Sequence, residues 1–200
     1  MRKNLITALW MTIATTILLG IIYPLVVTGL AQVLFPEQAN GELIRAHGKV
    51  VGSRLIAQAF TGREYFHPRP SAVSYDPTNS NGSQLGPTNQ KLIDRVKGDV
   101  AALHAEHPGV PVPIDLVTAS ASGFDPDISP AAAEFQLARV AKERGATLEQ
   151  LRALVAKYTD GRQFGIFGEP RVNVLELNLE LDQRYPMKHQ ARAEPGVSGN

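Results

Sequence analysis

A long apolar run opens the chain. No charged side chain occurs between Lys3 and Glu37, and the stretch from Leu5 to Phe35 consists mostly of Leu, Ile, Val, Ala and Thr. About 20 apolar residues, each rising about 1.5 Å along a helix, are enough to cross the hydrocarbon layer of a membrane. The pattern therefore predicts a single transmembrane helix as an anchor over residues 1–36, with the span at about 5–30.

A cleaved signal peptide is the alternative interpretation of this run. Arg2 and Lys3 would supply its basic start, but its apolar core would extend for only about 7–15 residues before a small-residue cleavage site. Here the run continues past Gly20 and Pro24 to Leu34, which favours an uncleaved anchor. Pro24 is expected to kink the helix, a feature that membrane helices tolerate.

The charges that flank the span predict its orientation. Arg2 and Lys3 precede it, whereas Glu37 and Glu42 come before the first downstream basic residue. Because basic residues tend to stay on the cytoplasmic side, we expect a cytoplasmic N-terminus and an extracytoplasmic location for residues 37–200.

Beyond the anchor, the pattern predicts one soluble α+β domain over residues 37–184. Short apolar runs at 43–44 and 50–51 surround His47-Gly48-Lys49 and indicate a β-hairpin. Residues 65–89 are dense in Pro, Ser, Asn and Gly and are expected to form a long loop. Residues 185–200 are polar and are predicted to be a flexible tail.

Apolar residues at three- to four-residue spacing predict a helix from Gln90 to about residue 106. Most of residues 112–118 have a high β-propensity, and this run predicts a strand. Ser129-Pro130 indicates the start of a second helix, and Gly145 its end.

A third helix is predicted from a capping box at Thr147 and Gln150, with an expected end at Gly161. Its inward stripe would be Leu148, Leu151, Leu154 and Val155. In residues 172–181, apolar and polar side chains alternate as they do in a strand. Asn173 and Glu176, however, resemble a helix cap and its partner, and we therefore favour a helix.

Composition excludes several classes of protein. The 20 Lys and Arg nearly balance the 19 Asp and Glu, and this argues against a protein that tracks nucleic-acid phosphates. The absence of cysteine excludes disulfides, thiolate nucleophiles and cysteine-bound metal centres.

A search for catalytic or metal-binding motifs finds no phosphate-binding loop, no G-x-S-x-G elbow and no H-E-x-x-H. Three weaker candidates remain: His104 with His107 for a metal ion, Asp125 with Asp127 for a cation, and Ser120 with Ser122 for an anion. Such residues are more often exposed histidines or parts of ordinary turns. Gln136 lies among apolar neighbours, and the pattern alone assigns it no catalytic role.

Three classes of function remain open. A single span, an external domain and an empty motif search suggest an accessory subunit. A membrane-tethered ligand-binding or sensor module, with loop 65–89 as its recognition surface, is the alternative. A hydrolase that uses the serine loop at 120–122 is the third.

Several stretches occur together in a specific order. They are Tyr23-Pro24-Leu25, residues 65–72, residues 115–123, Arg139-Val140-Ala141 and residues 168–179. In this order and spacing they resemble the C subunit of the Kdp potassium-transporting P-type ATPase, over most of the chain. The resemblance implies a bacterial inner-membrane subunit, surrounded by membrane lipid, that is needed for assembly and activity of the complex.

The resemblance also implies two partners, a channel-like potassium-translocating subunit and a P-type ATP-hydrolysing subunit. This chain lacks the D-K-T-G phosphorylation motif of the hydrolysing class and is therefore expected to be non-catalytic. No nucleic acid or metal is expected. Gly20, Pro24 and Gly29 are expected to face partner helices, because small residues allow close approach.

Two mechanisms are associated with this subunit type. In one, the chain is a catalytic chaperone that raises the ATP affinity of the ATPase subunit, and its glutamine, which corresponds to Gln136, helps to hold the shared ATP. In the other, the external domain braces the potassium-translocating subunit. The predicted orientation favours bracing, because a residue outside cannot contact a nucleotide across about 30 Å of hydrocarbon. An effect on ATP affinity would then be a long-range coupling.

Overall fold

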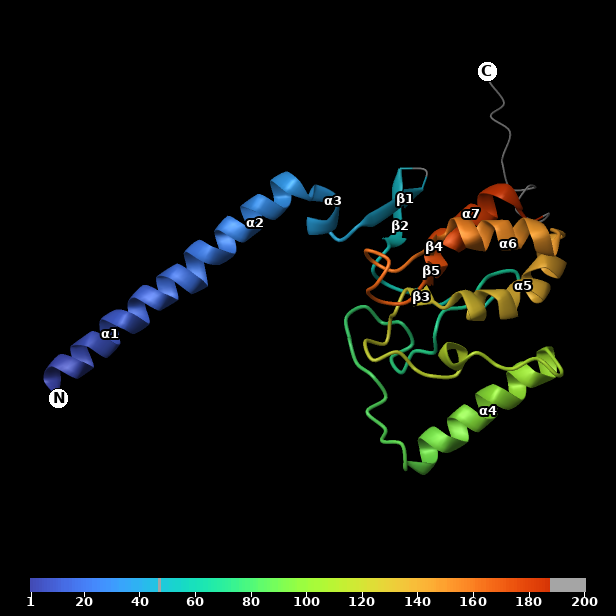
Figure 1. Cartoon of the computed structure of the whole chain (residues 1–200), viewed down its shortest axis with the longest axis horizontal. Coiled ribbons are helices and arrows are strands. Elements are labelled where there is room, and N and C mark those ends of the chain that lie inside the picture. Colours follow the sequence, from blue (N-terminus) through green and yellow to red (C-terminus); the bar gives the residue numbers. More distant parts are fainter. Residues whose placement is uncertain (47, 188–200) are drawn as a thin grey trace, which may run out of the picture. The chain divides into compact units, whose positions relative to one another are not determined.

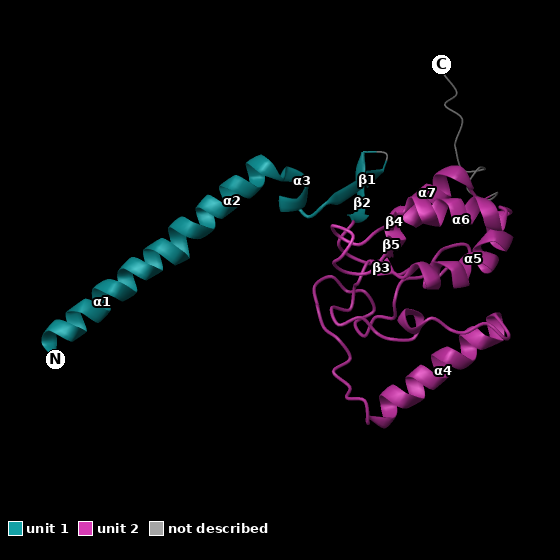
Figure 2. Ribbon diagram, viewed as in Figure 1, with its two compact units in different colours: residues 1–53 teal, residues 54–200 magenta. Residues whose placement is uncertain are grey.

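The computed structural model describes residues 1–46 and 48–187. The chain divides into two compact units, residues 1–53 and residues 54–200 (Figure 2). The first consists of a long helix and a hairpin, and the second mixes helices with a small sheet (Figure 1).

The first unit begins with one continuous helical stretch. It comprises α1 (Arg2–Ile17), the π-helical turn η1 (Leu18–Ile22) and α2 (Tyr23–Leu34). Its 33 residues are apolar enough to cross a membrane, and in the part of the chain that the structure describes none of its side chains is buried. At about 1.5 Å per residue the stretch is about 50 Å long, which exceeds the thickness of a hydrocarbon layer.

Pro24 is accommodated by a change of helix type. A proline inside an α-helix clashes with the carbonyl four residues earlier, here that of Gly20. The wider turn of η1 covers Gly20 and ends two residues before Pro24. Irregular turns of this kind are a common way for a helix to carry a proline.

A short helix, α3 (Pro36–Ala39), connects this stretch to a two-stranded antiparallel hairpin. The predicted hairpin is confirmed as β1 (Leu43–Ala46) and β2 (Lys49–Ser53), with a register irregularity between Ile44 and Arg45. Of its predicted turn, His47 lies outside the described residues, and Gly48 has the positive φ (76°) that a tight turn needs.

Four helices build most of the second unit. They are α4 (Gln90–Glu106), α5 (Pro130–Arg144), α6 (Leu148–Lys157) and α7 (Val174–Arg184). Each begins after a residue whose side chain accepts a hydrogen bond from a backbone N–H of the first turn; these residues are Asn89, Ser129, Thr147 and Asn173. The three helices predicted over residues 90–160, and the helix favoured over residues 172–181, are confirmed.

A small antiparallel sheet joins the ends of these helices. Its strand order is β3 (Asp127–Ile128), β5 (Arg171–Asn173), β4 (Thr159–Asp160). Residues 172 and 173, at the start of the ambiguous segment, therefore belong to β5, and α7 follows directly.

Two elements of the sequence prediction were wrong. Residues 112–118 contain no strand but the short 3-10 helix η2 (Ile114–Leu116). Pro111 and Pro113 on either side of Val112 lack the N–H groups that a strand ladder requires. Helix α6 ends at Lys157 rather than at Gly161, because Thr159 and Asp160 pair with β5.

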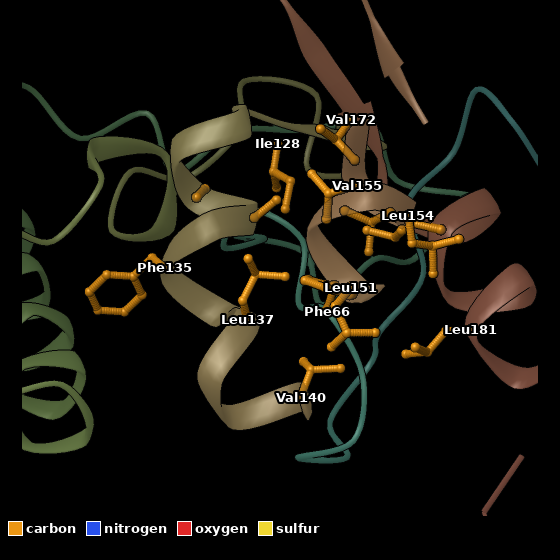
Figure 3. Packing of buried hydrophobic residues seen from close by; sticks show 14 of the residues in the cluster. Phe66, Ile128, Phe135, Leu137, Val140, Leu151, Leu154, Val155, Val172 and Leu181 are labelled. Carbon is orange, nitrogen blue, oxygen red and sulfur yellow. The ribbon is translucent and has the colours of Figure 1, made fainter. Parts of the chain in front are cut away.

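The hydrophobic core of the second unit lies between α5, α6, α7 and β5 (Figure 3). Its largest fully buried apolar side chains are Phe66, Ile128, Leu137, Leu151, Leu177 and Leu181. Leu148, predicted to point inward, is instead 45% exposed at the start of α6. Of the predicted tail, Tyr185 packs against the core and residues 188–200 lie outside the described residues.

Candidate functional site

The most highly organised polar region of the second unit surrounds the segment Gly62–His67, which we call the clamped segment. Every backbone carbonyl of this segment accepts a hydrogen bond from a side chain. The donors come from α5, from α7 and from the ring of His67 itself. A stretch without regular secondary structure thereby has its backbone carbonyls paired, as they would be in a sheet.

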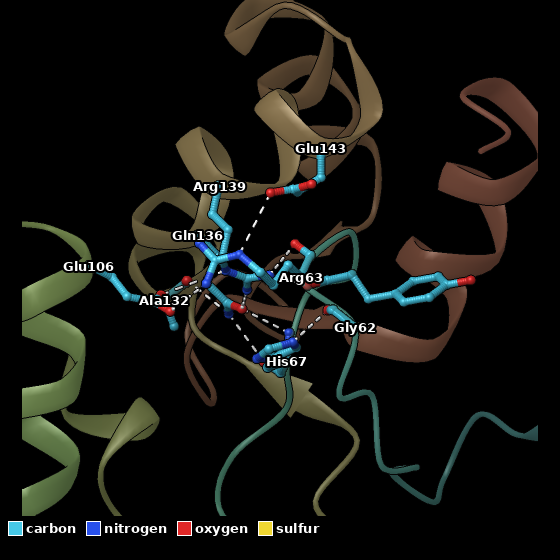
Figure 4. Close-up of polar contacts among 9 residues, drawn as sticks. Gly62, Arg63, His67, Glu106, Ala132, Gln136, Arg139 and Glu143 are labelled. Carbon is cyan, nitrogen blue, oxygen red and sulfur yellow. Dashed lines mark hydrogen bonds and ion pairs between the residues drawn. The ribbon is translucent and has the colours of Figure 1, made fainter. Parts of the chain in front are cut away.

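Two side-chain amides hold the end of the clamped segment in the same way. The Phe66 N–H donates to Asn178 Oδ1 at 2.9 Å, and Asn178 Nδ2 donates back to the Phe66 carbonyl at 2.9 Å. The next residue, His67, exchanges an equivalent pair with Gln136, at 2.8 and 3.1 Å (Figure 4). Because successive residues of an extended chain point in opposite directions, Phe66 pairs with α7 and His67 pairs with α5.

Gln136 uses its whole hydrogen-bonding capacity inside the chain. Oε1 accepts from the His67 N–H and from Arg139 Nη2, and Nε2 donates to the carbonyls of His67 and Ala132. The side chain offers two donors and two acceptor lone pairs, so these four bonds satisfy it. Only 4% of the residue is exposed.

Two buried arginines of α5 bind the rest of the segment. Arg139 Nη1 donates to the carbonyls of Arg63 and Tyr65, and its nearest carboxylate is that of Glu106, with Nε and Oε2 3.9 Å apart. Burial lowers the pKa of Arg139, and the charge of Glu106 opposes that shift. Arg139 therefore acts as a donor to backbone oxygens in a poorly solvated place.

Arg144, five residues further along α5, is paired more closely with a carboxylate. Its Nη2 lies 2.7 Å from Asp182 Oδ1 on α7, and its Nε donates to the Glu64 carbonyl at 2.9 Å. Its guanidinium also lies over the ring of Tyr65, 4.7 Å from the centroid. This arginine ties α5, α7 and the clamped segment together.

The imidazole of His67 lies against the start of the clamped segment. Nε2 lies 2.8 Å from the carbonyl oxygen of Gly62, and because a carbonyl only accepts, Nε2 is the donor of this hydrogen bond. Burial lowers the pKa of His67; the hydrogen bond to Gly62 opposes this shift, and the neighbouring charge of Arg139 adds to it.

A cavity of about 290 Å³ lies next to this network. Its apolar lining includes Phe60, Leu103, Leu116 and Phe135, and its polar lining includes His67, Glu106, Gln136 and Arg139. The amide of Gln136 and the Nη atoms of Arg139 are already committed to the backbone and to each other. The arrangement can hold a loop against two helices.

The other candidate groups occupy structural positions. Ser120 is buried, and its Oγ accepts hydrogen bonds from the backbone N–H groups of Gly123 and Asp125, as expected for an ordinary turn. Asp125 pairs with Arg69 at 2.8 Å and Asp127 with Arg171 at 3.1 Å. Ser122 Oγ accepts from the Phe124 N–H.

The candidate metal ligands do not gather. Within residues 1–46 and 48–187, no group of three or more His, Asp or Glu side chains is placed to hold a metal ion. The ring of His107 packs edge-on against Phe135, with 4.6 Å between centroids.

The predicted helix-packing residues all lie in the membrane-length stretch. Gly20 is in η1, and Pro24 and Gly29 are in α2. A Cβ atom at Gly29 would meet nothing within 4 Å, and one at Gly20 would meet only Thr16 Cγ2 at 3.9 Å. Among residues 1–46 and 48–187, no contact therefore requires glycine at these two positions.

The amide and arginine partners of the clamped segment were not identified as a group from the sequence. One signal was present: Gln136 and Arg144 fall in the same helical stripe as the buried Ala132 and Val140, and Asn178 falls in the stripe of Val174 and Leu181. A polar residue in an apolar stripe indicates a buried hydrogen-bonding partner. The sequence does not show which backbone segment it binds.

Comparison with known proteins identifies one family. The family model "K+-transporting ATPase, c chain" matches residues 5–183. A protein of Koribacter versatilis named potassium-transporting ATPase KdpC subunit is 62% identical over 189 residues, which cover 94% of this chain and 98% of that protein. Proteins of the same name from Rhodospirillum rubrum and Methylobacterium nodulans are 58% and 54% identical, over 94% and 92% of this chain and 100% and 98% of their own lengths.

The family model covers the chain from residue 5 in α1 to residue 183 in α7, a range that includes the clamped segment and its partners. The resemblance read from the sequence motifs is thus confirmed. The chain belongs to the family of K+-transporting ATPase C chains, membrane-associated subunits of a P-type ATPase complex that transports potassium.

Proposed function

We propose that this chain is a non-catalytic accessory subunit that stabilises the assembled pump. Its N-terminal helix spans the bacterial inner membrane with the N-terminus in the cytoplasm. The domain over residues 37–184 lies outside and braces the potassium-translocating subunit. The charge distribution around the span supports this orientation.

The observation that carries the proposal is the set of hydrogen bonds made by the Gln136 side chain. Its four hydrogen bonds all go to the chain itself, so the residue that a nucleotide role would need is a fixed part of the domain. Binding a nucleotide through this amide would break bonds to His67 and leave buried backbone groups unpaired, which is costly. We infer that any effect of this subunit on the ATP affinity of the ATPase subunit is transmitted through the complex.

The span contributes a second contact to the assembly. Gly20 and Gly29 leave room on a helix that otherwise carries large apolar side chains, and small residues allow membrane helices to approach closely. We propose that partner helices pack at these glycines and at Pro24, with lipid around the remaining surface.

Co-purification from native membranes tests the proposal. Tagged full-length chain is extracted in mild detergent from cells grown in scarce potassium, and the co-eluting proteins are identified by mass spectrometry. We expect a P-type ATPase and a large polytopic subunit in stoichiometric amounts. Recovery of the well-solubilised chain alone would contradict the proposal and favour a tethered binding or sensor module.

Variants of the span refine this test. Gly20→Leu with Gly29→Leu is expected to reduce co-purification, because the added side chains prevent close helix packing. Leu25→Phe is the control, since residue 25 already carries a large exposed side chain. Equal recovery of both variants would contradict packing at the glycines.

A further inference from the structure

The cavity beside the clamped segment has a polar corner whose hydrogen bonds are incomplete. The cavity, of about 290 Å³, belongs to the second unit, and its lining includes the last turn of α4 and the middle of α5. Glu106 reaches the corner from α4, and Arg139 reaches it from α5 (Figure 4). The two side chains face one another without forming a hydrogen bond.

The Nε–H group of Arg139 is the incomplete donor. Nη1 donates to two backbone carbonyls of the clamped segment, and Nη2 donates to Gln136 Oε1. In the part of the chain that the structure describes, Nε has no acceptor, because Glu106 Oε2 is 3.9 Å away. The Arg139 side chain is only 5% exposed. A buried donor without a partner is costly and indicates that a partner comes from outside the chain.

The gap between these two atoms fits one oxygen atom. Atoms that lie 3.9 Å apart can both be within hydrogen-bond distance, about 2.7–3.0 Å, of a single oxygen beside them. That oxygen has to accept from Arg139 Nε and donate to Glu106 Oε2. A hydroxyl does both, whereas a carboxylate has no donor and an ammonium has no acceptor. The geometry therefore selects a hydroxyl group.

The charges of the corner favour a neutral ligand. The carboxylate of Glu106 lies beside Arg139 and also beside Arg63, with Oε1 3.4 Å from Arg63 Nη1. Arg63 in turn lies 3.6 Å from Glu143. Two arginines thus accompany two glutamates. A charged ligand would disturb this balance next to the poorly solvated Arg139, and burial of an uncompensated charge is unfavourable.

The remaining lining suits an apolar body. Its apolar members include Phe60, Leu103 and Phe135, together with Pro68 and Pro70. An apolar cavity of about 150 Å³ is enough to bind benzene. The cavity of about 290 Å³ can therefore hold a ring with short substituents. A water molecule at the polar corner would satisfy Arg139 but would leave these apolar side chains in contact with solvent.

At Tyr75 the wall of the cavity is fixed by the chain itself. The backbone φ of Tyr75 is +59°, in the left-handed region that bulky residues rarely adopt. The Tyr75 N–H donates to Ser71 Oγ at 2.9 Å, and its hydroxyl donates to the Arg69 carbonyl at 2.8 Å. A wall that is formed before the ligand arrives lowers the entropy cost of binding.

We propose that this cavity binds a small neutral molecule with an apolar ring and one hydroxyl group, such as a phenol, with the hydroxyl between Arg139 Nε and Glu106 Oε2. The inference is independent of the proposed function. Leu103 and Glu106 lie on α4, which buries none of its residues, so we expect the ligand to enter from this side. A bound ligand would then hold the last turn of α4 against α5.

Two ligands of the same shape test the inference on the full-length chain in detergent. 4-Ethylphenol carries the hydroxyl, and 4-ethyltoluene carries a methyl group in its place. We expect 4-ethylphenol at millimolar concentration to slow amide hydrogen exchange in the last turn of α4 by about threefold or more, and 4-ethyltoluene to have no such effect. Slowing by both compounds would overturn the inference. Slowing by neither would also overturn it and would mean that the polar corner holds only water.

A variant that fills the cavity gives a second readout. Leu103→Trp enlarges a side chain of the lining and is expected to abolish the effect of 4-ethylphenol on α4. Ala101→Trp is the control, because residue 101 is exposed on the same helix and does not line the cavity. The control should respond like the unmodified chain. If folded Leu103→Trp also responds in this way, the ligand binds elsewhere and the inference fails; if this variant does not fold, the comparison of the two compounds decides.

Discussion

At the scale of single residues, the domain depends on polar side chains that serve the backbone. Gln136 and Asn178 each pair with both polar groups of one backbone residue, and Arg139 and Arg144 bind the carbonyls of residues 63–65. These residues are buried, and a buried polar group that loses its partner costs more than the bond contributed. Their replacement should therefore affect stability first.

Gln136→Leu tests this account. The change leaves the His67 N–H and carbonyl and one Arg139 donor without their partner, so we expect the free energy of unfolding to fall by about 2–3 kcal/mol. The measurement is denaturant unfolding of the full chain in detergent, followed by circular dichroism. Gln183→Leu, at an exposed position of α7, should change stability by less than about 0.5 kcal/mol.

The assembled complex gives the second half of the same test. If Gln136 is structural, Gln136→Leu should lower the amount of intact complex and leave the apparent ATP affinity of the remaining complex unchanged. A variant chain of normal stability whose complex binds ATP more weakly would contradict the structural role.

His67 makes the stability of the domain dependent on pH. Burial lowers its pKa in the folded chain below the ordinary value of 6.5, so the unfolded chain takes up a proton first as the pH falls. The stabilising contribution is complete above about pH 6.5 and decreases as the pH falls from there toward the folded-state pKa.

The expected result is a difference between two chains. Between pH 7.5 and pH 5.5, the unmodified chain should lose more unfolding free energy than His67→Gln, which cannot take up this proton. Denaturant unfolding at a series of pH values measures both. Parallel pH profiles would show that His67 does not titrate differently in the folded state.

At the scale of elements, the second unit has a tightly packed part and a loosely packed part. Helix α5 buries nine residues, whereas α4, which the structure describes throughout, buries none. Its apolar stripe, including Leu92, Val96 and Leu103, is only half-covered. Helices with few buried contacts open more readily than those at the centre of a core.

Hydrogen exchange should reveal this difference. The backbone amides of α4 are expected to exchange at least tenfold faster than those in the middle of α5, measured by mass spectrometry on the full chain in detergent. Helix α6, of which one face is buried at Leu151, Leu154 and Val155, should lie between them. Equal protection of α4 and α5 in the isolated chain would contradict the loose packing.

Some elements of this fold could be predicted from the sequence, and others could not. The helices were predictable because their caps and stripes are local, as at Ser129 and Thr147. The strand expected over 112–118 was wrong because the prolines on either side of Val112 outweigh its β-branched composition. The partners of the clamped segment could not be predicted, because Gln136 and Asn178 meet residues that lie 69 and 112 positions away in the sequence.

At the scale of the whole molecule, the central claim is that one helix anchors the chain while the second unit acts outside the membrane. Two observations support this claim: the charge distribution around the span, and the hydrogen bonds that Gln136 makes within the domain. It excludes direct contact between this domain and ATP, since ATP is hydrolysed on the cytoplasmic side of a bilayer whose hydrocarbon layer is about 30 Å thick.

Labelling of single cysteines tests the claim most directly. The chain has no cysteine, so Glu149→Cys and Gln183→Cys each introduce one thiol at an exposed position of the second unit, and Lys3→Cys places one before the span. A membrane-impermeant maleimide is added to spheroplasts that contain the complex. We predict rapid labelling of residues 149 and 183 in intact spheroplasts and labelling of residue 3 only after the membrane is opened; the reverse pattern would contradict the account.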